Sequence, residues 1–171
     1  MPLIRTPDHR LRVFVSSTLR ELAPERESAR AAIESLGMTP VLFELSARPY
    51  PPRSIYRAYL EQSHIFVGLY WQRYGWVAPG MEISGLEDEY RLAESRPKLI
   101  YFKGSAPERQ PRLTEMIEQI RADGDVSYKH FTSSDELQEM LRNDLALLLA
   151  ERFEAAGIAG REVDQPSPRT T

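Results

Sequence analysis

Hydrophobic residues are spaced along this chain in two alternating ways. Short runs rich in β-branched, aromatic and aliphatic residues are typical of strands. Such runs occupy residues 11–16, 39–44, 64–71, 98–103 and 126–131. Between them, apolar residues recur at every third or fourth position, as they do on one face of a helix. The pattern therefore predicts five strand–helix units.

The expected helices also carry start signals. Their predicted extents are about 24–36, 53–62, 84–96, 113–124 and 133–153. Pro24 suits a first helical turn, and Ser16, Ser17 and Thr18 before it offer N-cap hydroxyls. The connection after the first strand is therefore expected to be a short turn that leads into a helix.

Residues 64–71 form the most apolar of the predicted strands, which is typical of a central strand covered on both faces. Alternating strands and helices predict a parallel sheet between two layers of helices, and right-handed crossovers leave few strand orders. We predict a three-layer, flavodoxin-like α/β fold with a five-stranded sheet of order 2-1-3-4-5. Ligands of such sheets bind at the carboxyl ends of the strands beside the topological switch, here the loops at 16–20 and 71–84.

A single domain accounts for the length of the chain, 171 residues, of which 42% are hydrophobic. That content supplies one continuous core. The predicted α/β domain covers residues 10–156. Residues 1–9 and 157–171 are expected to be a disordered N-terminus and a disordered tail or linker, because Gly, Pro, Ser, Thr and charged residues dominate the tail.

Charge and composition narrow the range of partners. The net charge is −3 with both signs interspersed, so no concentrated basic face for nucleic acid is expected. No run of about 18 apolar residues and no signal-peptide pattern is present, which indicates neither membrane insertion nor secretion and favours the cytoplasm. Cysteine is absent, and His9, His64 and His130 lie in unrelated segments, so we expect no metal site.

The predicted switch carries hydroxyls and charges. Ser16, Ser17 and Thr18 present hydroxyls and backbone N–H groups in a geometry that suits phosphate or ribose, although as helix caps they need no ligand. Arg20 is either a phosphate partner or a solvated surface arginine. Glu44, at the end of the second strand, accepts ribose hydroxyls in one interpretation and organises its loop in the other.

Aromatic residues gather after the third strand, where Trp71, Tyr74 and Trp76 stand with Arg73. Such rings stack on a base or on nicotinamide, but they equally pin a long loop or form a protein interface. Both interpretations stay open from the sequence.

Three acidic residues, Glu87, Asp88 and Glu89, stand near the start of the predicted third helix. Residues two apart on a helix point about 200° away from each other, so only one of Glu87 and Glu89 is expected to enter a cleft. Their simplest role is to favour the helix dipole from the first turn. On the first helix, Glu25 and Arg26 are interpreted as surface or intrahelical ion pairs.

Two segments together carry a family resemblance. One reads VFVSST at 13–18 with Glu25 and Arg26 downstream, and the other reads YG at 74–75, SGLEDEY at 84–90 and then Ala93. Over about residues 11–153 the chain resembles the bacterial family catalogued as domain of unknown function 4062, whose members resemble Toll/interleukin receptor (TIR) domains. Members often begin large multidomain proteins with ATPase or repeat modules. The resemblance implies a flavodoxin-like sheet and a nucleotide-facing cleft in one module of a signalling or defence protein.

The resemblance also implies a chemistry. Some TIR domains cleave NAD at the nicotinamide–ribose bond with a glutamate on the helix after the third strand. Nucleoside deoxyribosyltransferases are similar, with alanine four residues beyond their glutamate. Glu89 and Ala93 match that spacing, whereas Leu86 stands where the transferases favour threonine, and Ser84 is the nearby hydroxyl. Cleavage leaves positive charge on the sugar, which a carboxylate stabilises or attacks.

Two functions therefore remain open. In the first, the domain recognises a nucleotide and hydrolyses NAD or a related N-glycosidic bond, with Glu89 as the catalytic residue and no separate cofactor. The expected nucleotide-binding residues are Ser16, Ser17, Thr18, Arg20, Glu44, Trp71, Arg73, Tyr74, Ser84 and Glu87. In the second, the domain is a non-catalytic module for self-association or for binding other modules of a larger chain.

Overall fold

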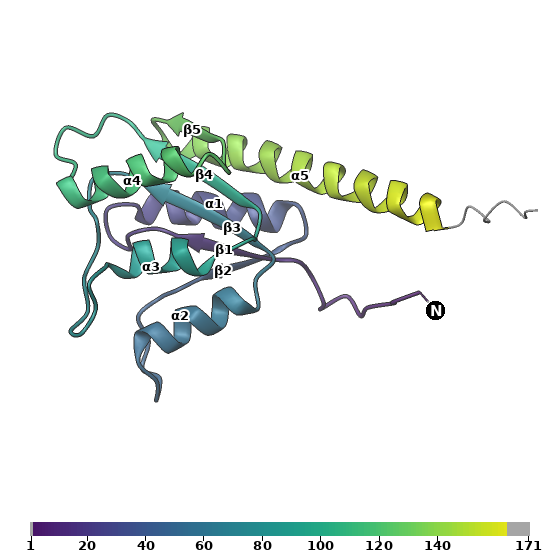
Figure 1. The fold of residues 1–171 in the computed structure, drawn as a ribbon, viewed down its shortest axis with the longest axis horizontal. Helices are drawn as coiled ribbons and strands as arrows, with labels where there is room; N and C mark the ends of the chain where they lie inside the picture. The colour runs from purple at the N-terminus through teal and green to yellow at the C-terminus, as the bar shows by residue number, and fades with distance from the viewer. Residues whose placement is uncertain (1, 164–171) are drawn as a thin grey trace, which may run out of the picture.

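The computed structural model describes residues 2–163; residue 1 and residues 164–171 lie outside the described part. Strands and helices alternate along the described chain (Figure 1). The strands are β1 (Arg12–Ser16), β2 (Thr39–Leu42), β3 (Ile65–Tyr70), β4 (Lys98–Lys103) and β5 (Tyr128–Phe131). The helices are α1 (Ala23–Ser35), α2 (Pro52–Glu61), α3 (Gly85–Leu92), α4 (Pro111–Asp123) and α5 (Ser134–Val163).

These strands form one parallel sheet of order β2-β1-β3-β4-β5, which confirms the predicted order. β1 and β3 are neighbours although α1, β2 and α2 separate them in sequence, and Ser16 of β1 pairs with Gly68 of β3. The chain winds outward to β2 on one side of this pair and to β4 on the other. The topological switch therefore lies at the carboxyl ends of β1 and β3.

β3 lies at the centre of the sheet because it is apolar on both faces, and all its residues are buried. Ile65, Val67 and Leu69 belong to a core formed with α1 and α5. Phe66 and Tyr70 belong to a second core formed with α2, α3 and α4. The sheet is thus covered by helices on both faces, as the sequence predicts.

The hydroxyls after β1 do not cap α1, contrary to one sequence interpretation. Leu22 occupies the N-cap position without a side-chain hydrogen bond, and Pro24 lies in the first turn. Leu22 is fully buried, so packing fixes the turn between β1 and α1. Ser16, Ser17 and Thr18 are therefore available for other contacts at the switch.

α5 continues further than the sequence predicts. Its first half packs leucines against the core with α1, and the helix then runs on beyond the domain to Val163, with residues 151–161 exposed (Figure 1). The expected helix end near Phe153 and the expected disorder of 157–163 are therefore wrong. Alanine, glutamate and arginine, which have high helix propensity, offset Gly157 and Gly160 in this segment. Residues 164–171 of the predicted tail lie outside the described residues.

The other end of the chain contains neither helix nor strand between residues 2 and 11. None of the described helices is both long enough and apolar enough to cross a membrane.

Candidate functional site

A cleft of about 810 Å³ opens at the topological switch. Its walls come from the β1–α1 loop, the β2–α2 loop, the first turns of α2, the β3–α3 loop and the first turns of α3. Clefts that bind small organic molecules have volumes of about 300–1,000 Å³. This cleft is therefore large enough for such a ligand, and both loops that the sequence indicates contribute to it.

Glu89 lines the bottom of this cleft from α3. Ser84 caps α3 by accepting a 3.3 Å hydrogen bond from the backbone N–H of Glu87, and this start directs Glu89 toward β1. Glu89 is 7% exposed and accepts a 2.5 Å hydrogen bond from the Ser16 hydroxyl at the end of β1. Burial raises the pKa of Glu89 to about 8, although the Ser16 hydrogen bond and the charge of Arg26 act to lower it. This carboxyl is therefore mostly protonated near neutral pH.

Arg26 supports the cleft from α1, and sequence reasoning missed it. Its guanidinium donates a 3.0 Å hydrogen bond to the Ser17 hydroxyl and a 2.9 Å hydrogen bond to the Phe43 carbonyl. Burial lowers the pKa of Arg26, whereas the charges of Glu44 and Glu89 raise it. This buried cation ties together the carboxyl ends of β1 and β2 and provides positive charge near Glu89.

Glu25 is also buried, so the expected surface pairing of Glu25 and Arg26 is wrong. The Glu25 carboxylate forms a 2.5 Å ion pair with Lys103 at the end of β4. The cause is helix phase, since positions 25 and 26 continue the buried stripe that includes Leu22 and Ala29. That spacing is a sequence signal that places both charged residues against the sheet.

Trp71 packs away from the cleft. Its ring lies beneath the Lys103 ammonium, 4.0 Å from the ring centroid, and its indole N–H donates a 2.8 Å hydrogen bond to the Ser105 carbonyl. These contacts hold the loop that follows β3 against the end of β4. They correspond to the loop-pinning interpretation of this residue.

Tyr74 likewise anchors the β3–α3 loop. Its ring is buried, and its hydroxyl bonds the Glu87 carboxylate and accepts a 3.2 Å hydrogen bond from the backbone N–H of Ser84. Glu87 also pairs with Arg91 at 2.7 Å and faces a separate groove between α3 and α4. Glu87 and Glu89 therefore point to different surfaces. Of the aromatic residues in this loop, Trp76 does line the cleft, and it is 70% exposed.

The mouth of the cleft is positively charged. One carboxylate oxygen of Glu21 accepts hydrogen bonds from the Thr18 hydroxyl at 2.9 Å and from the Arg73 backbone N–H at 3.0 Å, which joins the two switch loops. The side chains of Arg20 and Arg73 line the cleft and make no hydrogen bond or ion pair within residues 2–163. Glu44, in contrast, is exposed outside the cleft and pairs with Arg30 at 3.4 Å.

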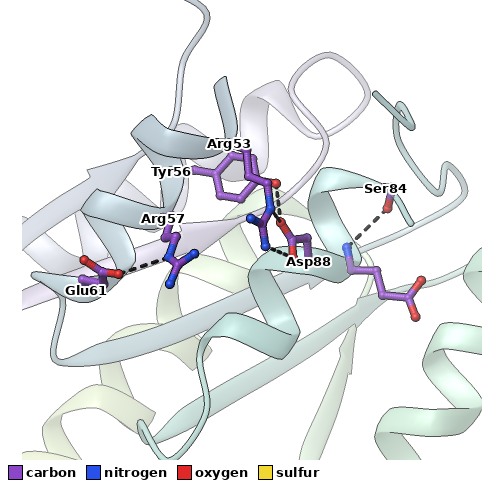
Figure 2. Close-up of polar contacts among 7 residues, drawn as sticks. Arg53, Tyr56, Arg57, Glu61, Ser84 and Asp88 are labelled. Carbon is purple, nitrogen blue, oxygen red and sulfur yellow. Dashed lines mark hydrogen bonds and ion pairs between the residues drawn. The ribbon is translucent and has the colours of Figure 1, made fainter. Parts of the chain in front are cut away.

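The opposite wall is fixed by a carboxylate of α3. Figure 2 shows Arg53 and Tyr56 of α2 pointing at Asp88, which accepts hydrogen bonds from them at 2.8 Å and 2.5 Å. Burial raises the pKa of Asp88, but these two donors outweigh it and hold that pKa below its ordinary value. Asp88 therefore joins α2 to α3 beside the cleft as a stable anion.

The cleft brings together about half of the residues that the sequence singles out. Those that line it are Ser17, Thr18, Arg20, Arg73 and Glu89, with Ser16 bonded to Glu89 from behind. Those that do not line it are Glu44, Trp71, Tyr74, Ser84 and Glu87. Among the described residues no group of His, Asp or Glu side chains is arranged to hold a metal ion.

The parallel sheet and its switch-point cleft define a flavodoxin-like α/β domain. Within that class, residues 12–146 match the family model described as domain of unknown function (DUF4062). The chain therefore belongs to this family, as its VFVSST and SGLEDEY segments indicate.

Solved structures share the fold at low sequence identity. A diflavin flavoprotein from Nostoc sp. superposes with a TM-score of 0.51 and 11% identity, covering 85% of this chain and 96% of that chain. A flavoprotein from Thermotoga maritima superposes with a TM-score of 0.50 and 16% identity, covering 82% of this chain and 35% of that chain. A CMP N-glycosidase from Clostridium botulinum superposes with a TM-score of 0.49 and 16% identity, covering 76% of this chain and 97% of that chain. No curated protein matches the chain.

Proposed function

We propose that this domain binds a nucleotide in the cleft and cleaves an N-glycosidic bond, with NAD and its nicotinamide–ribose bond as the leading substrate. One observation carries the proposal: the buried carboxyl of Glu89 lines the switch-point cleft, held by the Ser16 hydroxyl. Buried titratable groups with shifted pKa values in a cleft are typical of active sites. The resemblance to TIR domains supports a role as one module of a signalling or defence protein.

In the proposed reaction the bond between ribose C1′ and the nicotinamide nitrogen breaks, and the nitrogen keeps the bonding electrons. Neutral nicotinamide leaves, and positive charge develops on the ribose beside the Glu89 carboxylate. Water then adds at C1′ and loses a proton, so the products are nicotinamide, ADP-ribose and one proton. The carboxylate stabilises the ribose charge directly or through a transient ester.

The ionisation of Glu89 favours a substrate that carries positive charge. The carboxyl acts in this reaction as an anion, but with a pKa of about 8 only about a tenth of it is ionised at pH 7. The nicotinamide ring of NAD is cationic, and an opposite charge within a few ångströms favours the ionised carboxylate. Substrate binding then produces the active form of Glu89.

The rest of the cleft complements the other parts of a dinucleotide. Arg20 and Arg73 at the mouth have no protein partner among the described residues and suit phosphate oxygens. Trp76 presents an exposed ring on which a base can stack. The β3–α3 loop, which carries Arg73 and Trp76, is anchored by Trp71 and Tyr74, and Glu21 joins it to the β1–α1 loop that carries Arg20, so the ligand contacts are preorganised.

The direct test is nicotinamide release from NAD by the purified domain, at dilute and at high protein concentration and in forced oligomers. We expect release by the wild type and a loss of about 100-fold or more in Glu89→Gln. Glu115→Gln is the matched control, because Glu115 lies on α4 along the other groove. Absence of release from the wild type in all three formats would overturn the proposal.

A second candidate function is a non-catalytic interaction module. It is favoured by Leu45, Tyr50 and Trp76, large apolar side chains that are 76%, 59% and 70% exposed on the two loops beside the cleft. In that case Leu45→Ser with Trp76→Ser abolishes self-association in analytical ultracentrifugation, and NAD gives no thermal shift with the wild type. Nicotinamide release from NAD by a monomeric wild type excludes this candidate.

A further inference from the structure

Tyr70 places a polar group in the core without a partner. The residue ends β3, is 1% exposed, and its hydroxyl makes no hydrogen bond to any described residue. More than about 90% of buried polar groups in proteins have a hydrogen-bond partner, so an orphaned hydroxyl calls for an explanation. A phenylalanine in this place would fill the same core without that penalty.

The backbone is shaped to admit this hydroxyl. Gly68 lies two residues earlier on β3, and a Cβ atom at that position would stand 2.6 Å from the Tyr70 hydroxyl oxygen and 2.9 Å from Ile100 Cδ1. Any side chain at position 68 would therefore displace the tyrosine. Because Gly68 is the sheet partner of Ser16, the space that it leaves lies beside the end of β1.

The groups around the hydroxyl belong to the Glu89 site. Burial raises the pKa of Tyr70 well above its ordinary value, the nearby charge of Glu89 raises it further, and contact with Ser16 acts in the opposite direction. The Ser16 hydroxyl donates its own proton to Glu89, which leaves its oxygen free to accept a hydrogen bond. Ser16 is thus a suitable acceptor for the orphaned proton of Tyr70.

We propose that Tyr70 is a positioning residue of the cleft, whose hydroxyl donates to Ser16 while Ser16 donates to the ionised carboxylate of Glu89. A small rotation of the Ser16 side chain completes this chain when Glu89 loses its proton. Each donor polarises the next, so the negative charge on Glu89 is shared along the relay. The catalytic consequence rests on the proposed function, whereas the relay itself concerns only the three side chains.

A tyrosine on the opposite face of the sheet provides the contrast. Tyr101 of β4 is equally buried, but its hydroxyl donates a 2.6 Å hydrogen bond to Asp144 of α5. Tyr101→Phe therefore removes a satisfied hydrogen bond and leaves Glu89 untouched. Tyr70→Phe removes a hydroxyl that has no partner. We therefore expect Tyr101→Phe to lower the melting temperature and Tyr70→Phe to leave it unchanged or raise it.

The test is the titration of the Glu89 carboxyl, followed by infrared spectroscopy as the band that is lost in Glu89→Gln. In Tyr70→Phe we expect the pKa of Glu89 to rise by about half a unit or more, because Ser16 loses the donor that strengthens its own hydrogen bond to the ionised carboxylate. Tyr101→Phe should titrate as the wild type does. An unchanged Glu89 titration in Tyr70→Phe, or a loss of stability equal to that of Tyr101→Phe, would overturn the relay.

This measurement needs no turnover, so it separates the relay from the proposed reaction. A shifted Glu89 titration together with no nicotinamide release supports the relay and rejects NAD as the substrate. Where the wild type does release nicotinamide, Tyr70→Phe should move the pH profile of the rate to higher pH by the same amount as the carboxyl titration.

Discussion

Two adjacent carboxyl groups on α3 have opposite environments. Asp88 faces α2, where a guanidinium and a phenol donate to it, and its pKa lies below the ordinary value. Glu89 faces β1, where a serine hydroxyl donates to it, and burial raises its pKa to about 8. Both side chains are buried, so burial alone does not decide the charge state. The number and charge of the donors decide it.

This difference separates a structural carboxylate from a reactive one. Asp88 is satisfied by protein groups and joins two helices, which is a sufficient role for a buried anion. Glu89 has a single hydrogen bond to the described residues and lines a cleft, and a buried carboxyl with one neutral donor stabilises the fold less than a paired carboxylate. Such a group is expected where binding or chemistry requires it.

The largest loss of stability is expected at Asp88. Asp88→Asn removes the charge that holds Arg53, and we expect a loss of about 2 kcal/mol in the free energy of unfolding. Loss of one member of a fully buried pair costs about 3–5 kcal/mol; the smaller value follows because the Arg53 side chain is 44% exposed. Urea denaturation measures this loss in the free energy of unfolding. The control is Glu61→Gln, because Glu61 belongs to an exposed ion pair with Arg57 on α2 (Figure 2). If Asp88→Asn is as stable as the wild type, Asp88 is not a structural carboxylate and the distinction from Glu89 is lost.

Glu89→Gln should have the opposite sign. A carboxyl whose pKa is about 8 in the folded protein and 4.5 in the unfolded chain keeps its proton in the folded state between these two values. Its stabilising contribution is complete below the unfolded pKa and is lost as the pH rises through the folded pKa. Relative to the wild type, Glu89→Gln should therefore gain about 5 kcal/mol between pH 4.5 and pH 8.5, because a shift of one pKa unit corresponds to about 1.4 kcal/mol. Thermal unfolding across this range measures the stability difference between Glu89→Gln and the wild type, with Glu115→Gln as the exposed control. A difference that does not change with pH would contradict the account.

The same pKa predicts how activity depends on pH. The ionised carboxylate is the reactive form, so kcat/KM for NAD should rise about tenfold between pH 7 and a plateau above pH 8. The increase should follow the Glu89 titration because kcat/KM reports the free enzyme. A rate that is independent of pH over this range would assign the chemistry to another group.

The smallest effect is expected at the mouth of the cleft. Arg20→Ala and Arg73→Ala each remove one phosphate partner that is open to solvent, so each should raise the Kd for NAD by about fivefold. Isothermal titration calorimetry measures the affinity, and Arg142→Ala on α5 is the control. If affinity is unchanged in both variants, the phosphates lie elsewhere.

The sheet order and the position of the cleft could be predicted because they depend on strong, regular signals. The apolar run in β3 requires a central strand, and the alternation of strands and helices leaves few topologies. Once the order is fixed, the loops after β1 and β3 must meet. The phase difference between Glu87 and Glu89 follows from helix geometry in the same way.

Side-chain partners that come from distant segments could not be predicted. Helix phase indicates that Arg26 is buried, but its partners are the carbonyl of Phe43 and the hydroxyl of Ser17, and neither contact leaves a pattern in the sequence. Tyr74 resembles a ligand-stacking ring until its hydroxyl is seen to hold Ser84. The length of α5 beyond Phe153 was also missed, because glycines and polar residues there resemble a linker although the helix continues.

The central claim is that Glu89 reacts while Asp88 supports, and one measurement tests it most directly. Nicotinamide release from NAD should be compared for the wild type, Glu89→Gln and Asp88→Asn at equal concentrations of folded protein. The account predicts a loss of about 100-fold or more in Glu89→Gln and a loss within about tenfold in Asp88→Asn. Release by Glu89→Gln at the wild-type rate would contradict it.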